Sequence, residues 1–170
     1  MTNAYNSYKS VSNLLNTNIE NVPTKLESFF NSYEELKSQV DQFKQIQNNE
    51  MVDQISNKFE NVGNYKVFIN QVSMDTVDDI RNVAINSINN GVVDYIYLIS
   101  QIDSKFVIVA MKNEKVIKDI NVSELVIETS KNFGGGASKD EVLSVGGGPN
   151  DYSIDETLKY VKESIVNNLK

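Results

Sequence analysis

Six of the eight glycines in this chain of 170 residues fall within one short segment, from Gly134 to Gly148. A glycine triplet stands at each end, Lys139 lies between the triplets, and Lys131 comes just before them. Glycine has no Cβ, so its backbone N–H groups are open and can form a nest for a phosphate, whose charge the lysines would balance. The same composition is also typical of tight turns and close backbone packing. Both interpretations stay open.

The sequence offers little else that could perform chemistry. The glycine spacing matches neither GxGxxG nor GxxxxGK[ST], so the common nucleotide-binding loops are not supported. With no Cys and no His, the chain has no thiolate nucleophile, no catalytic imidazole and no ligands for the usual zinc sites. The adjacent carboxylates Asp78-Asp79 and Asp140-Glu141 are typical of a solvated surface. An enzyme therefore has the weakest support, and no metal or cofactor is expected.

The charge balance restricts the partners. The chain has 16 basic and 23 acidic residues, a net charge of −7, and one arginine, Arg81. Broad electrostatic binding of nucleic acid is therefore disfavoured, and RNA binding would need a local basic patch. No apolar run approaches the roughly 20 residues of a membrane span, and residues 1–10 contain no signal-peptide core. We expect a cytoplasmic protein with no membrane partner.

The first 60 residues carry a helical apolar period. From residue 22 the apolar positions are spaced alternately by four and three, which is the a/d pattern of a coiled coil over three heptads. A shorter helix is expected before it. The two helices could form an antiparallel hairpin, pair with a second chain, or pack on the chain's own globular part. We assign residues 1–61 to a helical arm, whose candidate oligomerisation residues are Leu26, Phe29, Tyr33, Leu36, Val40 and Phe43.

The period changes after the turn signal Gly63-Asn64. Residues 65–72 predict a strand, 73–88 an amphipathic helix, 92–101 and 106–111 a hairpin of central strands, 122–133 a second helix and 141–145 a short strand. Ser153 and Glu156 form a capping box that opens a last helix. The order β-α-β-β-α-β-α predicts an α+β domain over residues 62–170, with a mixed sheet and helices mainly on one face.

This layout resembles the C-terminal domain of alanyl-tRNA synthetase, which is a member of the DHH-associated domain family, over nearly the full chain. The same module also ends large free-standing alanyl-tRNA editing proteins, so both parents stay open. The motifs that carry the resemblance are Ala4-Tyr5, residues 11–15, Val22-Pro23-Thr24-Lys25-Leu26, Gly63-Asn64-Tyr65-Lys66-Val67, Phe133-Gly134-Gly135-Gly136 and Val145-Gly146-Gly147.

The sequence departs from the family between the glycine clusters. There the family usually carries Arg-Pro, and a Gln before the second cluster, whereas this chain has Lys139-Asp140 and Ser144. Lysine keeps the positive charge but lacks the bidentate guanidinium fork. DHH phosphoesterases of the same superfamily place a His after the glycines, and this chain has none, so that activity is not implied.

The resemblance implies a non-catalytic module that contacts the elbow of an alanine-accepting tRNA and contributes to a homodimer. The alternative is a purely structural dimerisation domain with little or no affinity for RNA. The candidate RNA-binding residues are Lys131, Gly134, Gly135, Gly136, Ser138, Lys139, Gly146, Gly147 and Gly148.

Overall fold

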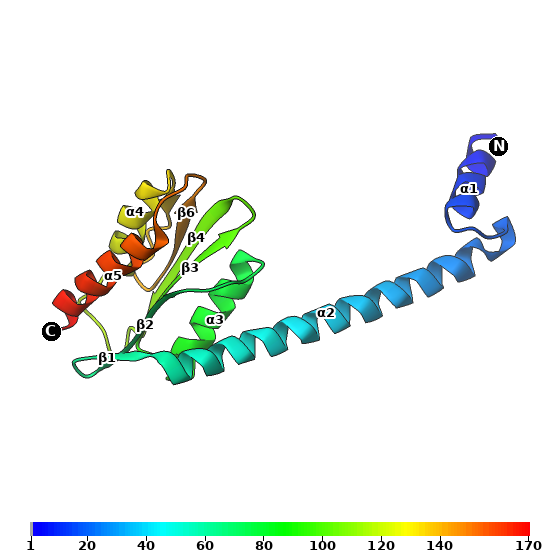
Figure 1. Cartoon of the computed structure of the whole chain (residues 1–170). Coiled ribbons are helices and arrows are strands. Elements are labelled where there is room, and N and C mark those ends of the chain that lie inside the picture. The colour runs from blue at the N-terminus through cyan, green and yellow to red at the C-terminus, as the bar shows by residue number, and fades with distance from the viewer. Residues whose placement is uncertain (1) are drawn as a thin grey trace. The chain divides into compact units, whose positions relative to one another are not determined.

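A computed structural model of the protein describes residues 2–170 (Figure 1). The chain divides into two compact units after Ile46. The first unit contains helix α1 (Thr2–Leu14), a 3₁₀ turn (Ile19–Asn21) and the beginning of helix α2 (Val22–Lys58). Ser12 and Val22 are buried in this unit, whereas the apolar residues of the a/d pattern from Leu26 onward are exposed. The predicted pair of N-terminal helices is therefore present.

The second unit contains a six-stranded mixed sheet with the strand order β1-β2-β3-β4-β6-β5. Strands β2 and β3 are parallel, and every other neighbouring pair is antiparallel. The strands are β1 (Glu60–Val62), β2 (Tyr65–Gln71), β3 (Tyr95–Ile102), β4 (Lys105–Lys112), β5 (Gly136–Ala137) and β6 (Leu143–Gly148). The helices are α3 (Val77–Asn89), α4 (Val122–Asn132) and α5 (Ile154–Leu169). The predicted α+β class with a mixed sheet is confirmed.

Helices cover both faces of this sheet, so the prediction of helices mainly on one face is wrong. Alternate residues of β3 are buried in two different clusters, Tyr95 and Tyr97 in one, Ile96 and Leu98 in the other. A strand with both faces apolar needs cover on both sides. Helices α4 and α5 bury the first cluster, while α3 and the last turns of α2 bury the second, and Figure 1 shows α3 on the opposite side of the sheet from α4 and α5.

The last turns of α2 belong to the core of the second unit. Val52 and Ile55 are buried there in the same cluster as Phe68 of β2. This packing is the reason why the compact units divide after Ile46, earlier than the predicted boundary between residues 1–61 and 62–170. The assignment of those two ranges as separate domains stays a prediction.

The ends of several elements differ from the prediction. Strands β1 and β5 were not expected, and β6 includes the second glycine triplet instead of ending before it. Glycine is disfavoured in strands, so propensity alone places the triplet outside the sheet. Helix α3 begins at Val77, where Thr76 Oγ1 accepts a hydrogen bond from Asp79 N at 3.1 Å. One of the two hydrogen bonds of the predicted capping box of α5 is present, because Ser153 Oγ accepts from Glu156 N at 3.2 Å.

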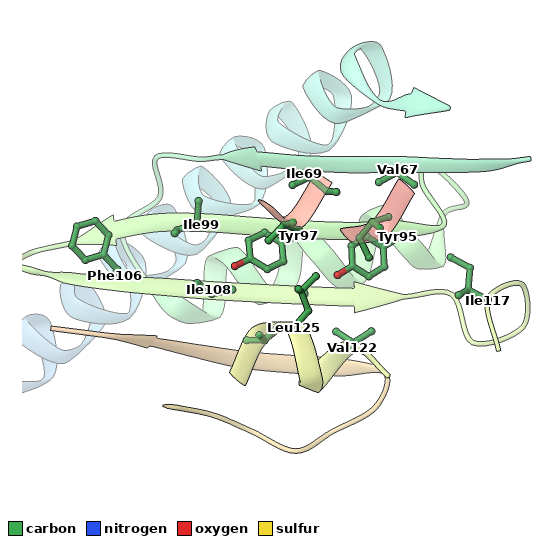
Figure 2. Close-up of a cluster of buried hydrophobic side chains, with 14 of the residues drawn as sticks. Val67, Ile69, Tyr95, Tyr97, Ile99, Phe106, Ile108, Ile117, Val122 and Leu125 are labelled. Carbon is green, nitrogen blue, oxygen red and sulfur yellow. The ribbon is translucent and has the colours of Figure 1, made fainter. Parts of the chain in front are cut away.

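Two buried tyrosines of β3, Tyr95 and Tyr97, lie on the face of the sheet that α4 and α5 cover. Figure 2 shows Tyr95 and Tyr97 on the same side of β3 as Val122 and Leu125 of α4. Tyr97 Oη lies 2.9 Å from Thr129 Oγ1 of α4, a buried hydrogen bond. Burial raises the pKa of both phenols well above the ordinary value, so they stay neutral. This contact fixes α4, and therefore its last residues, relative to the centre of the sheet.

Among residues 2–170, no helix combines the length and the apolar character that crossing a membrane requires.

Candidate nucleic-acid interface

The two glycine triplets are paired with each other at one edge of the sheet. Gly136 of β5 lies opposite Gly147 of β6, and Ala137 opposite Gly146. On its other side β6 pairs with β4, where Gly148 faces Phe106. The segment between α4 and the end of β6 therefore forms a narrow hairpin on the outermost strands. The structure brings the predicted glycines together here.

Close packing of backbones explains why glycine is required at several of these positions. A Cβ atom on Gly147, whose φ is +134°, would overlap the carbonyl of Phe106, and one on Gly135 would overlap the carbonyl of Gly147. Neither backbone neighbour can move aside without breaking the sheet edge. Gly136 differs, because no atom lies within 4 Å of the place where its Cβ would stand.

The N–H groups of the triplets are largely occupied within the chain. Gly134 N donates to Lys131 O at 3.0 Å, and Gly135 N donates to Ser130 O at 3.0 Å. Gly147 N donates to Ser130 Oγ at 2.8 Å. A phosphate nest needs free N–H groups that point to one centre. Because these three donors already have partners, an anion at this edge would depend mainly on side chains.

Ser138, one of the predicted RNA-binding residues, continues the pairing of β5 with β6 by one more step. Ser138 N donates to Val145 O at 2.9 Å, and Ser138 Oγ accepts from Val145 N at 3.0 Å. The hydroxyl of Ser144, which is buried, donates to Ser138 O at 2.8 Å. These hydrogen bonds hold the loop that follows. Ser138 thus has a structural role in addition to any contact with RNA.

A carboxylate turn closes the loop next to Lys139. Asp140 Oδ1 accepts hydrogen bonds from Val142 N at 2.8 Å and from Leu143 N at 2.9 Å. These two hydrogen bonds lower the pKa of the Asp140 carboxyl below its ordinary value, and the one from Leu143 N makes the larger contribution. This turn stands where the family resemblance leads one to expect proline, and it leaves the preceding Lys139 exposed.

The two candidate lysines are both exposed at this edge. Lys131 lies in the last turn of α4, which packs against β5 and β6, and Lys139 lies in the loop between those strands. Within residues 2–170, neither lysine forms an ion pair, whereas Lys162 is paired with Glu60 at 3.1 Å. Two ammonium groups without acidic partners are therefore available to phosphates.

An aromatic residue that sequence reasoning missed lies beside the first triplet. The ring of Tyr152 packs edge-on against Phe133, with 5.6 Å between centroids, and its side chain remains 39% exposed. Phe133 is itself buried against Phe106, with 4.8 Å between centroids. An exposed aromatic ring is suited to stacking on an unpaired base, and Glu128 and Glu156 line the same hollow as Tyr152. Its position after the second triplet was the signal available in the sequence.

The predicted oligomerisation residues lie on one helix of the first unit. All six project from α2 between residues 26 and 43, and each is exposed, from 38% for Leu26 to 63% for Phe29. We call this set, Leu26, Phe29, Tyr33, Leu36, Val40 and Phe43, the α2 seam. Exposed apolar groups in such a regular row are typical of an interaction surface.

Metal binding has no candidate cluster among the described residues, since no group of three or more His, Cys, Asp or Glu side chains is placed to hold an ion.

Over most of its length this chain has a fold similar to that of a solved C-terminal synthetase domain. It matches the solved C-Ala domain of Aquifex aeolicus alanyl-tRNA synthetase with a TM-score of 0.55 and 24% identity, covering 62% of this chain and 96% of that domain. No model of a known protein family matches the sequence.

Two alanine–tRNA ligases are similar in sequence. The ligase of Alkaliphilus oremlandii is 29% identical over 166 residues, which cover 95% of this chain and 18% of the ligase. The ligase of Methanococcoides burtonii is 25% identical over 147 residues, which cover 86% of this chain and 16% of the ligase. The resemblance to the C-terminal domain of alanyl-tRNA synthetase is thus confirmed, and the chain spans less than a fifth of these relatives.

Proposed function

We propose that this chain is a non-catalytic tRNA-binding and oligomerisation module from the C-terminal part of an alanyl-tRNA synthetase or of a large alanyl-tRNA editing protein. The observation that carries the proposal is the pair of exposed lysines, Lys131 and Lys139, at the glycine edge of a fold shared with the C-Ala domain. Sequence similarity to alanine–tRNA ligases over 86% and 95% of the chain supports the same parent class. Such a module works in the cytoplasm.

The RNA-binding surface consists of the two lysines, the exposed first triplet and the hairpin that carries them. Its ligand is an alanine-accepting tRNA, contacted in the elbow region. Lysines supply the phosphate contacts. The glycines keep the hairpin thin, so that the RNA backbone meets no bulky side chain, while Ser138 and Asp140 fix the loop in which Lys139 is exposed.

A charge reversal tests this surface. Replacing Lys139→Glu removes one phosphate contact and adds repulsion, so the tRNA affinity should fall about tenfold at low salt. The matched control is Lys58→Glu, an exposed lysine that precedes β1 at the opposite edge of the sheet. Filter binding of tRNA measures both variants. Equal affinities for the wild type and the Lys139→Glu variant would remove this residue from the interface.

Oligomerisation is assigned to the α2 seam. Six exposed apolar side chains on one helix are costly in water and are buried when a second helix pairs with them. Replacing Leu36→Glu places a charge in the middle of the seam and should yield monomers. Ser38→Glu puts the same charge on the side of α2 away from the seam and should leave the oligomer intact. Light scattering coupled to size exclusion gives the mass of each variant in solution.

The second candidate function is a purely structural dimerisation domain. Two observations favour it. Glycine N–H groups already donate hydrogen bonds within the chain, and close backbone packing explains why glycine stands at positions 135 and 147 without any ligand. Measurements of the oligomeric state and of tRNA binding in solution distinguish the two functions. A concentration-independent monomer that still binds tRNA would overturn the structural alternative, and a dimer that binds no tRNA at low salt would overturn the RNA-binding proposal.

A further inference from the structure

The α2 seam has an internal symmetry that bears on how two copies would pair, and this inference rests on the proposed oligomerisation. Three of its members are aromatic and three are aliphatic. Read from Leu26 forward, the order is aliphatic, aromatic, aromatic, aliphatic, aliphatic, aromatic. When the same row is read from Phe43 back to Leu26, each position that was aromatic in the forward order is aliphatic, and each aliphatic position is aromatic. The seam is therefore complementary in side-chain size to a second copy of itself in the antiparallel orientation.

We propose that two copies of the chain associate through the α2 seam as an antiparallel helix pair, with the twofold axis between Tyr33 and Leu36. In this register Leu26 faces the partner's Phe43, and Phe29 faces the partner's Val40. At the centre Tyr33 faces the partner's Leu36. Every layer then contains one large ring and one smaller side chain, so the volume per layer is nearly even.

A parallel pair lacks this property. Each residue would face its own copy, so layers with two rings, such as those of Phe29 and Tyr33, would alternate with narrow layers of two valines or two leucines. Knobs-into-holes packing needs a nearly constant distance between the helices, and uneven layers leave gaps or overlaps. Parallel packing is therefore disfavoured.

The neighbouring antiparallel registers are disfavoured for the same reason. A slip of one heptad in one direction places Phe29 against the partner's Tyr33, and a slip in the other places Tyr33 against the partner's Phe43. Both create layers of two rings beside layers of two aliphatic residues. The composition of the seam thus selects one register as well as one direction.

The residues that flank the seam fit a second copy in this orientation. Parallel coiled coils commonly use opposite charges at the e and g positions, but between residues 25 and 44 the charged residues at those positions are all lysines: Lys25, Lys37 and Lys44. In an antiparallel pair e positions face each other, so Lys37 lies beside the partner's Phe30. A cation over an aromatic ring is attractive without an acidic partner.

Distance measurements between spin labels test the direction. The chain has no Cys, so one introduced cysteine carries one label in each copy. Ser38→Cys and Gln45→Cys both place the label on the side of α2 away from the seam. With about 1.5 Å rise per residue, the antiparallel pair separates the labels along the axis by about 10 Å at position 38 and about 32 Å at position 45. In a parallel pair the two labels lie at the same height along the axis at both positions.

The expected result is a distance for the position 45 label pair that exceeds that for the position 38 pair by more than about 10 Å. Equal distances at the two positions would overturn the antiparallel inference while leaving oligomerisation intact. A monomeric mass with no dipolar signal would instead overturn the oligomerisation proposal itself. Mixing Tyr33→Cys with Leu36→Cys chains gives a second readout: mainly mixed disulfides are expected, and mainly like-with-like disulfides would contradict the proposed register.

Discussion

Ser130, in α4, accepts a hydrogen bond through its hydroxyl from the backbone N–H of Gly147, in β6, at 2.8 Å. The backbone carbonyl of Ser130 also accepts from Gly135 N at 3.0 Å. One residue therefore contacts both glycine triplets and anchors them to the helix turn that carries Lys131. Because Ser130 is fully buried, these contacts are protected from competition by water.

Replacing Ser130→Ala should therefore weaken the fold. It removes the acceptor of Gly147 N and leaves that partly buried donor without its partner in the chain. We expect the free energy of unfolding to fall by about 1–2 kcal/mol in urea titrations. The control Ser56→Ala removes an exposed hydroxyl on α2 and should change the midpoint little. A wild-type midpoint in Ser130→Ala would mean that this hydrogen bond contributes nothing measurable.

Two glycines of the hairpin should respond very differently to alanine. Gly147→Ala combines a φ of +134° with a Cβ that overlaps the carbonyl of Phe106, so we expect a loss of more than about 2 kcal/mol in unfolding free energy. Gly136→Ala meets open space and should change stability by less than about 1 kcal/mol. Denaturant titrations compare the two. Similar costs for both would contradict the close-packing explanation.

The turn at Asp140 makes a small part of the stability dependent on pH. The backbone hydrogen bonds from Leu143 and Val142 hold the pKa of this carboxyl in the folded state below its ordinary value of 3.8. Its contribution is therefore complete above that value and is lost as the pH falls through the lower, folded-state pKa. Asp140→Asn keeps an acceptor oxygen but does not titrate.

The variant should accordingly lose less stability than the wild type on acidification below about pH 4. Thermal unfolding followed between pH 6 and pH 2.5 gives the comparison. Parallel acid profiles for the two proteins would show that the turn does not bind the carboxylate more strongly than the unfolded chain does.

Tyr152 is expected to contribute to RNA binding by stacking. Replacing Tyr152→Leu keeps an apolar group against Phe133 but removes the exposed ring, so the tRNA affinity should fall about tenfold, within the range known for stacked bases. Tyr8→Leu makes the same change on α1 and should bind tRNA as the wild type does. If the two variants bind equally well, Tyr152 lies outside the interface.

Local sequence signals were sufficient for much of the fold. The turn at Gly63, the capping box at Ser153 and the apolar run of residues 95–99 predicted the order of the main elements correctly. The distribution of helices over the two faces of the sheet was predicted incorrectly. It depends on the last turns of α2, because Val52 and Ile55 share a buried cluster with residues of β2 and β3 that are distant in the sequence. A helical apolar period shows which residues share a face of the helix, but it does not identify the surface on which that face packs.

The candidate site shows the same limit. The glycine cluster and its two lysines were visible in the sequence, but the reason for the glycines was not. Gly147 is fixed by a carbonyl of Phe106, 41 positions away, and by the hydroxyl of Ser130, 17 positions away. Contacts at such separations exist only after the sheet has formed. The occupied N–H groups, which weaken the phosphate-nest interpretation, therefore required the structure.

The dependence of tRNA binding on salt tests the central claim most directly. A double variant, Lys131→Gln with Lys139→Gln, removes two phosphate contacts, and a second double variant, Lys58→Gln with Lys159→Gln, removes two exposed lysines elsewhere. If the glycine edge binds tRNA, the slope of log affinity against log salt should fall in magnitude by about 1.5 in the first variant and stay at the wild-type value in the second. Identical slopes in the wild type and the first variant, or no tRNA binding by the wild type at low salt, would contradict the account.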